Sequence, residues 1–248
     1  MSVLSNLEIK NFQEEGYLVF EGLIPKTHLE HYIEIFNEMV RHAKNLKDHA
    51  GPYYLELGKD NTPITGMLHK VQGVCVADPR LLAMASQIEI LDRIEGLVGS
   101  NIDVFGTKFF PKLPGGGTST SWHQDNFYFG TNSSEIISCG IYLQDADEEN
   151  GCLQVIPGSH STDQIFEHSP ESGRHGSWTN VDTELRKVIS VPGGSVVLFS
   201  ANLLHGAVDN TSSTRTRYST AWHYIPGNLC LEKFPRETFK DRHTVRGI

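Results

Sequence analysis

Two histidines and an aspartate have the spacing of a metal site. His123 and Asp125 are separated by one residue, and His205 follows 82 residues after His123. Two imidazoles and one carboxylate on one face of a metal leave its opposite face open, which is the ligand set of non-haem Fe(II) oxygenases. The open face can take an oxidisable cosubstrate together with O₂. The triplet therefore predicts an iron oxygenase whose metal ligands are His123, Asp125 and His205.

A β-strand can present the first two ligands together. Side chains at positions i and i+2 of a strand point to the same face, about 6.6 Å apart along it. We therefore expect His123 and Asp125 to bind one ion from a single strand end, and His205 to come from a different strand. The pair alone is a weak signal, because the chain contains 12 histidines and 30 acidic residues.

Length and composition indicate one globular domain. The chain has 248 residues, of which 38% are hydrophobic and 21% are charged, as is usual for a globular protein. A net charge of −9 argues against nucleic acid as a partner, since such surfaces are basic. The four cysteines are scattered and we expect them to be reduced. With neither a signal peptide nor a membrane-length apolar run, we expect a cytoplasmic protein without a membrane partner; the oligomeric state stays open.

The first third of the sequence has mainly helical patterns. We expect a helix over 6–16 that ends at Gly16, a strand over 17–20, and a helix over 25–47 with one apolar face. A third helix is expected over 79–98, with Pro79 at its first position.

From residue 102 the pattern changes to short strands separated by Gly- and Pro-rich turns. Strands are expected over 103–110, 136–143, 152–156 and 216–225, with a hairpin over 188–199. This pattern predicts a mainly β protein with a jelly-roll core from about 102 to 226, on which the helical first third packs. The long polar segment 161–186 is expected to be either a lid or disordered.

Several stretches of the chain are similar to one known family. They are Trp122-His-Gln-Asp125, Asn150-Gly-Cys-Leu-Gln-Val-Ile-Pro-Gly-Ser-His160, Pro192-Gly-Gly-Ser-Val-Val-Leu-Phe199 and Leu204-His-Gly206. Together they resemble the phytanoyl-CoA dioxygenase family of Fe(II)/2-oxoglutarate-dependent oxygenases, and the likeness extends from about residue 10 to 226.

The resemblance implies a double-stranded β-helix (a cupin-like jelly roll) and implies the same three metal ligands. It also implies that 2-oxoglutarate chelates the metal and that an arginine on the strand after His205 binds its far carboxylate. The spacing selects Arg217 for this role and leaves Arg215 possible. Lys70 and Lys108 match positions that lie near the cosubstrate, although the second is not usually lysine.

Three positions bear on specificity within this resemblance. Gly140 stands where some members have tryptophan, which should widen the pocket locally, and Ala207 replaces a frequent serine and removes one hydrogen bond to the cosubstrate. Related halogenases carry a small residue at the position of Asp125, so the aspartate argues for hydroxylation. The remaining histidines near these motifs are expected to be structural or on the surface, not ligands: His69, His160, His168, His175 and His223.

The expected function is therefore hydroxylation of a small-molecule metabolite with Fe(II), 2-oxoglutarate and O₂, releasing succinate and CO₂. Without an acyl-CoA-binding motif, phytanoyl-CoA itself is not the expected substrate. The same iron chemistry could instead give desaturation, epimerisation or ring rearrangement. From other classes, the alternatives are a non-catalytic jelly roll that binds metal and 2-oxoglutarate, and a zinc or nickel isomerase of the cupin type.

Overall fold

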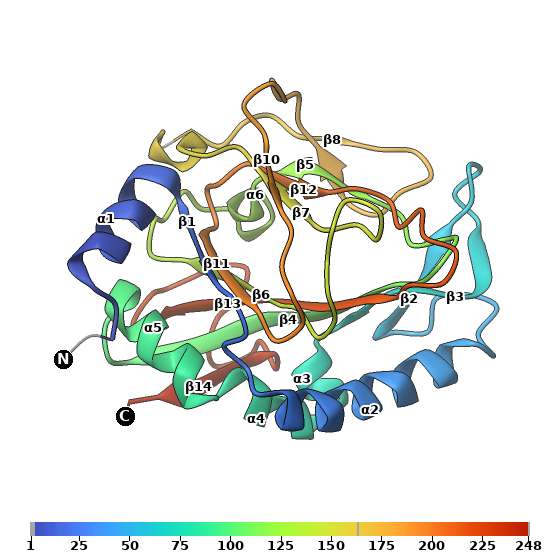
Figure 1. Ribbon diagram of the computed structural model, residues 1–248, viewed down its shortest axis with the longest axis horizontal. Coiled ribbons are helices and arrows are strands. Elements are labelled where there is room, and N and C mark those ends of the chain that lie inside the picture. Colours follow the sequence, from blue (N-terminus) through green and yellow to red (C-terminus); the bar gives the residue numbers. More distant parts are fainter. Residues whose placement is uncertain (1–2, 163, 248) are drawn as a thin grey trace.

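Two antiparallel sheets face each other, and helices cover the outer face of the larger one (Figure 1). The computed structural model describes residues 3–162 and 164–247. Within these residues the larger sheet has eight strands in the order β1-β11-β6-β13-β4-β3-β2, with β14 also paired to β4. The smaller sheet has the order β10-β7-β12-β5, and β8 and β9 form a separate pair. The predicted fold class, a mainly β jelly roll with flanking helices, is confirmed.

The elements have these bounds: α1 Asn6–Glu15, β1 Tyr17–Phe20, α2 Lys26–Ala43, β2 Tyr53–Leu57, β3 Pro63–Gln72, α3 Val74–Ala77, η1 Pro79–Leu81, α4 Leu82–Ala85, α5 Ile88–Val98, β4 Ile102–Lys112, β5 Thr120–His123, α6 Asp125–Phe129, β6 Ile137–Ile141, β7 Leu153–Val155, η2 Ser159–Ser161, β8 Ser169–Pro170, β9 Ser177–Trp178, β10 Lys187–Ile189, β11 Val196–Ser200, β12 His205–Ala207, β13 Arg217–Pro226 and β14 Arg242–Arg246.

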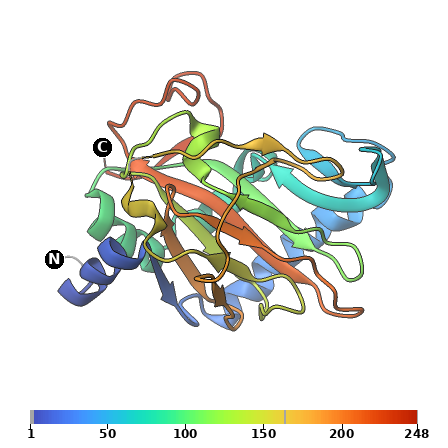
Figure 2. The same ribbon diagram turned by 90° about the horizontal axis from the view of Figure 1, so that it is seen from above.

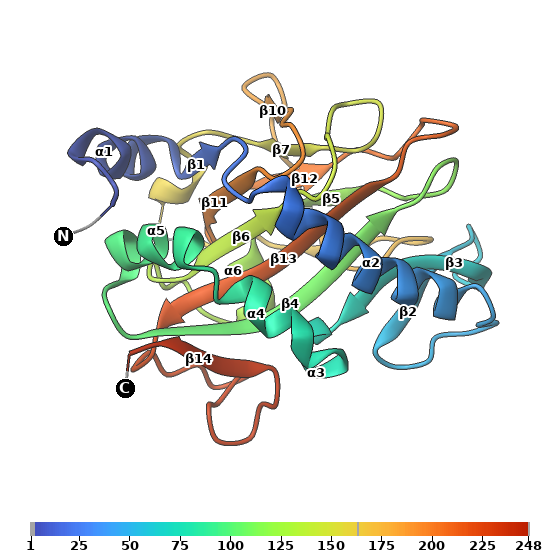
Figure 3. The same ribbon diagram turned by 60° about the horizontal axis from the view of Figure 1, so that its bottom comes forward.

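The first two predicted helices are confirmed, and local chemistry explains their ends. Helix α1 begins with a capping box in which the Ser5 side chain accepts from the Glu8 amide and the Glu8 carboxylate accepts from the Ser5 amide. It ends at Gly16, whose φ of 85° suits glycine. Helix α2 starts after Pro25 and buries one apolar face, including Leu29 and Phe36. It lies diagonally across the outer face of the larger sheet (Figure 3).

The predicted single helix over 79–98 is wrong in its continuity. Asp78 caps a short 3₁₀ turn, Pro79–Leu81, which leads into α4. The chain then breaks at Gln87, whose ψ of 134° is extended, before α5 begins. The apolar periodicity continues from α4 into α5, although the helix is interrupted between them. Helix propensity does not predict this interruption, because tertiary packing overrides propensity there.

The predicted hairpin over 188–199 is also wrong. β10 pairs with β7 in the smaller sheet, whereas β11 pairs with β1 and β6 in the larger sheet. The turn at Pro192-Gly-Gly194 therefore carries the chain from one sheet to the other. Gly194, with φ of 90°, lies close to the Ile24 carbonyl, where a Cβ would come within 2.6 Å of the oxygen.

The strands extend beyond the core predicted for 102–226. β1, β2 and β3 come from the first third and β14 comes after residue 226, and all four join the larger sheet. β2 and β3 thus lie between the predicted helices, in a stretch for which no strand was expected. Their polar faces and the bulges between them weaken the alternating pattern that would have marked strands.

The apolar core is divided by the sheets. One buried cluster packs the helices on the larger sheet, and a second, with Tyr142 and Val155, lies toward the smaller sheet. All four cysteines are unpaired; Cys230 alone among them is exposed. Every helix in the described part of the chain is too short or too polar to cross a bilayer.

Candidate active site and metal centre

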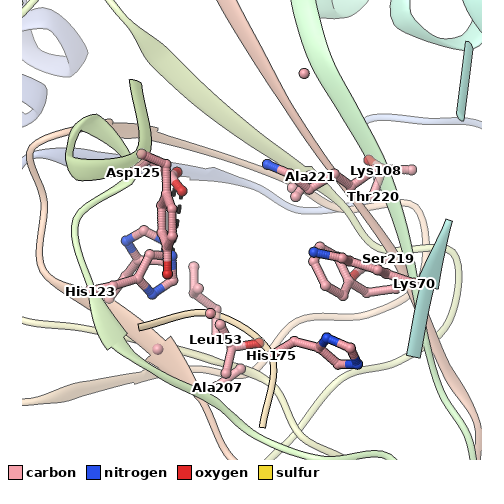
Figure 4. A pocket seen from close by; sticks show the side chains of 18 of the residues that line it. Lys70, Lys108, His123, Asp125, Leu153, His175, Ala207, Ser219, Thr220 and Ala221 are labelled. Carbon is pink, nitrogen blue, oxygen red and sulfur yellow. Dashed lines mark ion pairs between the residues drawn. The ribbon is translucent and has the colours of Figure 1, made fainter. Parts of the chain in front are cut away.

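The two predicted histidine ligands are neighbours across paired strands. His123 is the last residue of β5 and His205 the first of β12, and the two are direct partners in the ladder. Their ring centroids lie 4.2 Å apart. Asp125 completes the cluster, in which one candidate ligand atom from each residue lies within 4.8 Å of the others. In Figure 4, His123 and Asp125 stand together on one side of the cavity.

The prediction that His123 and Asp125 share one strand end is wrong, because β5 ends at His123. Asp125 is the first residue of α6, and the extended residue Gln124 joins the two elements. Gln124 is fully buried, and its amide group donates to the Asn202 carbonyl and accepts from the Phe166 amide. His123 and Asp125 therefore flank a residue, Gln124, whose side chain is held by hydrogen bonds, and this fixes the distance between them.

Hydrogen bonds orient both imidazoles for a metal. Nδ1 of His123 lies 2.8 Å from the Ser121 carbonyl, and Nδ1 of His205 lies 2.9 Å from the Leu203 carbonyl. Carbonyls only accept, so Nδ1 carries the proton in both rings and each Nε2 keeps a free lone pair. The Nε2 atoms lie 3.4 Å and 3.7 Å from the carboxylate of Asp125. Two such imidazoles beside a carboxylate fit the donor set that Fe(II) requires.

The protonation states also suit a metal. Burial lowers the pKa of His205 to about 4, helped by the neighbouring His123. Burial by itself would raise the pKa of Asp125, but His205, His223 and His123 around it bring that pKa well below its usual value. A neutral imidazole and an ionised carboxylate are the forms that bind metal at neutral pH.

The triad opens into a cavity of about 300 Å³ between the two sheets. This volume is at the small end of the range for small-molecule sites. Most of its wall is apolar, and the large side chains that line it include Phe110, Tyr128, Phe129, Leu153, Phe199 and Phe234.

The two candidate arginines have very different surroundings. Arg217 lines the cavity at 4% exposure, and its guanidinium donates to Ser219 and lies over the ring of Tyr142. Its Nε has no hydrogen-bond partner, and no described acidic residue forms an ion pair with it. Arg215 is on the surface and pairs with Asp147 and Glu149 at 2.7 Å and 3.0 Å. A buried, unpaired guanidinium needs an anion, which fits the carboxylate of 2-oxoglutarate.

Lys70 and Lys108 both line the same cavity, opposite the metal ligands (Figure 4). The Lys70 ammonium lies 5.0 Å from the centre of the Tyr54 ring and has no hydrogen-bond or ion-pair partner among the described residues. Burial, with the nearby Lys108, lowers the pKa of Lys70 to about 8. The Lys108 ammonium is 3.2 Å from Nε2 of His223.

The two departures from the family pattern lie on the cavity wall. A Cβ at Gly140 would be 3.4 Å from the ring of Tyr142, which directly follows the end of β6. The space beside Gly140 is therefore bordered by the ring of Tyr142, over which the guanidinium of Arg217 lies. Ala207 lines the cavity without a hydroxyl.

The segment 161–186, apart from residue 163, lies across the cavity and supplies His175 and Gly176 to its wall. His175 is 2.7 Å from the Leu55 carbonyl, and the Ser177 amide donates to the Tyr128 hydroxyl. The segment is thus attached to β2 on one side and to α6 on the other. Figure 2, which looks down onto the smaller sheet, shows the segment passing beside it.

The remaining histidines lie outside the candidate ligand cluster. His160 contacts the carbonyl of Gln13, and His69 pairs with the buried Glu56. Sequence reasoning missed the residues that touch Asp125, namely Ser138 and, beyond it, His223. Their residue types are ordinary, and only the pairing of β6 with β13 brings them to the carboxylate.

The chain is similar to known proteins over most of its length. A profile of the family described as phytanoyl-CoA dioxygenase (PhyH) matches residues 12–218. A probable alpha-ketoglutarate-dependent hypophosphite dioxygenase of Stutzerimonas stutzeri is 24% identical over 217 residues, covering 84% of this chain and 74% of that protein. The peroxisomal phytanoyl-CoA dioxygenase of Homo sapiens is 29% identical over 226 residues, covering 84% of this chain and 65% of that enzyme.

A solved structure shows the same fold. EctD from S. alaskensis with 2-oxoglutarate and 5-hydroxyectoine superposes with a TM-score of 0.75 at 19% identity, covering 95% of this chain and 83% of that one. At the level of the family, the predicted enzyme class, an iron- and 2-oxoglutarate-dependent dioxygenase, is confirmed. With most of its length matched by the family profile, the chain belongs to the phytanoyl-CoA dioxygenase (PhyH) family.

Proposed function

We propose that the protein hydroxylates an unactivated C–H bond of a small-molecule metabolite, with His123, Asp125 and His205 as its iron ligands. The observation that supports this most is the triad itself, since two oriented imidazoles and a carboxylate meet in a small, largely apolar cavity. Fe(II) with 2-oxoglutarate supplies the oxidation, in which O₂ is consumed, succinate and CO₂ are released and the substrate is hydroxylated. The hypophosphite and phytanoyl-CoA dioxygenases among the similar proteins support the same reaction class.

We assign the far carboxylate of 2-oxoglutarate to Arg217, with Lys70 as a second cation. Arg217 is buried without an acidic partner, and its planar guanidinium can hold a carboxylate with two hydrogen bonds. Lys70 lines the cavity with an unpaired ammonium. Arg215 is already paired on the surface, and Lys108 already contacts His223, so we assign the carboxylate to neither.

The rest of the wall contributes binding and exclusion of water. The aromatic side chains around the triad keep the reacting C–H bond in a dry space, and His175 and Gly176 close the cavity from the segment 161–186. The size of the cavity supports a small substrate. Four unpaired cysteines, three of them buried, are in keeping with a cytoplasmic enzyme.

Succinate release tests the proposal. Anaerobically purified protein is loaded with Fe(II) and 2-oxoglutarate, exposed to O₂ and screened against small metabolites of several charge classes. Substrate-dependent succinate, abolished in Asp125→Ala, is the expected result. Tight binding of 2-oxoglutarate without turnover of any compound would favour the non-catalytic alternative, and a protein that works with zinc and is indifferent to iron would favour an isomerase.

A further inference from the structure

A chain of hydrogen bonds runs behind the proposed metal ligand Asp125. The Ser138 hydroxyl donates to Oδ2 of Asp125 at 2.6 Å. Nδ1 of His223 is 3.0 Å from the same hydroxyl, and Nε2 of His223 is 3.2 Å from the ammonium of Lys108. Ser138 and His223 are each only 1% exposed. The three residues come from the adjacent strands β6, β13 and β4, so the chain crosses the sheet to reach the carboxylate.

The chemistry of the groups fixes the direction of every bond in this chain. A lysine ammonium can only donate, so Nε2 of His223 must accept, and the ring proton must be on Nδ1. Nδ1–H then donates to the oxygen of Ser138, whose own proton goes to Asp125. Asp125 accepts at the end of the chain, so the chain needs its carboxylate form.

A bulge in β4 brings Lys108 to His223. Ala221 faces Lys108 and His223 faces Phe105, so β4 contains one extra residue between these pairs. Gly106 lies in that bulge with φ of 60°, and a Cβ there would be 3.3 Å from the His223 ring. The following residue, Thr107, is held through its amide and hydroxyl by the carboxylate of Asp241. Such bulges redirect side chains next to active sites.

The chain leaves the two carboxylate oxygens in different situations. Oδ2 accepts from Ser138 and lies 3.7 Å from Nε2 of His205. Oδ1 accepts no hydrogen bond from the described residues and lies 3.4 Å from the unprotonated Nε2 of His123. Ordinary packing does not account for Lys108, because a half-buried lysine ammonium that lines a mostly apolar cavity without an ion pair is costly. Its position is understandable if its charge acts on Asp125.

We propose that Lys108, His223 and Ser138 form a relay that positions Asp125 for the metal, holding Oδ2 so that Oδ1 is the binding atom. The relay rests on the proposed function, because it presumes that Asp125 is a ligand. It assigns Lys108 to the metal side of the site instead of the cosubstrate. All three are positioning residues, which act on the metal only through the carboxylate.

Binding of Co(II) to the full-length protein without 2-oxoglutarate tests the relay, because its visible absorption reports ligand geometry and its affinity can be titrated. The variants are Ser138→Ala, Lys108→Met and the double variant. Ser195→Ala is the matched control, since Ser195 is equally buried but donates to the backbone carbonyl of Pro192, outside the cavity. Melting temperatures of the metal-free proteins show whether each variant folds.

We expect Ser138→Ala to weaken Co(II) binding by about 10- to 100-fold, as is usual when a partner of a metal ligand is removed, with an altered absorption spectrum. Lys108→Met should weaken it less, and should add nothing once Ser138 is alanine, because the relay is already broken. Ser195→Ala should bind Co(II) like the wild type.

The outcomes separate this inference from the proposed function. A wild-type protein that binds no Co(II) would overturn both. A wild-type protein that binds Co(II), with Ser138→Ala binding equally well, would overturn the relay and leave the proposed function standing. Additive losses in the double variant would also overturn it, because independent contributions mean that Lys108 does not act through Ser138.

Discussion

Replacing Arg217 with methionine should weaken 2-oxoglutarate binding and at the same time stabilise the protein without ligands. The two effects have one cause. The guanidinium is buried at 4% exposure, has a free Nε and pairs with no described acidic residue. The empty protein therefore bears the cost of burying a charge that only a bound anion compensates.

The structure allows both effects to be sized. Removing one partner of a buried ion pair costs about 3 kcal/mol or more, which corresponds to a loss of about two orders of magnitude in affinity. Methionine fills similar space without a charge, so the metal-free, ligand-free protein should gain about 1–3 kcal/mol. For a chain of this size each kcal/mol raises the melting temperature by about 2–4 °C.

Two measurements on Mn(II)-loaded and metal-free protein check this prediction. Calorimetric titration gives the 2-oxoglutarate affinity, and thermal unfolding gives the stability with and without the ligand. Arg215→Met is the control, since Arg215 is exposed and pairs with Asp147 and Glu149, and it should leave the affinity unchanged. If Arg217→Met binds 2-oxoglutarate normally, or if the loss of affinity appears in the control, the assignment of the carboxylate is wrong.

Three further outcomes follow from the structure. Asp125→Ala should abolish substrate-dependent succinate release and weaken Fe(II) binding, and undiminished activity in this variant would exclude Asp125 as a ligand. Burial lowers the pKa of Lys70 to about 8, so its side chain is charged below this pH and neutral above it. The affinity for the anionic 2-oxoglutarate should therefore fall as the pH rises through 8. In binding titrations, Lys70→Met should remove that part of the pH dependence. Gly16→Ala should lower the free energy of unfolding by about 2–4 kcal/mol, because a Cβ would meet His160 and lie 2.8 Å from Leu203. Gly22 also has a positive φ, but a Cβ there would meet no other atom within 4 Å, so Gly22→Ala should cost only about 1–2 kcal/mol. Denaturant unfolding measures both changes.

The candidate metal site could be proposed from the sequence because few residue types bind iron. His123, Asp125 and His205 carry that chemistry in their side chains, and the motifs around them are local runs of sequence. The family resemblance gave Arg217 as the residue for the carboxylate of the cosubstrate and left Arg215 possible. The separation of Arg217 from Arg215 needed the structure, because the two differ in burial and not in type.

The predictions that failed depend on contacts between distant parts of the chain. Val188 to Phe199 has the local pattern of a hairpin, but the partners of the two strands lie elsewhere, in different sheets. The partners of Asp125 were missed because Ser138 and His223 have ordinary roles in most proteins. Their function arises from strand register and from a bulge, neither of which leaves a mark in the sequence near Asp125.

The hydrogen bonds from Thr107 to Asp241 connect the carboxyl-terminal segment to the candidate active site. Asp241 holds Thr107, and the next residue, Lys108, reaches Asp125 through His223 and Ser138. The family profile ends at residue 218, before both His223 and Asp241. A substitution at Asp241 would therefore act on the carboxylate of Asp125 from outside the residues that the family profile matches.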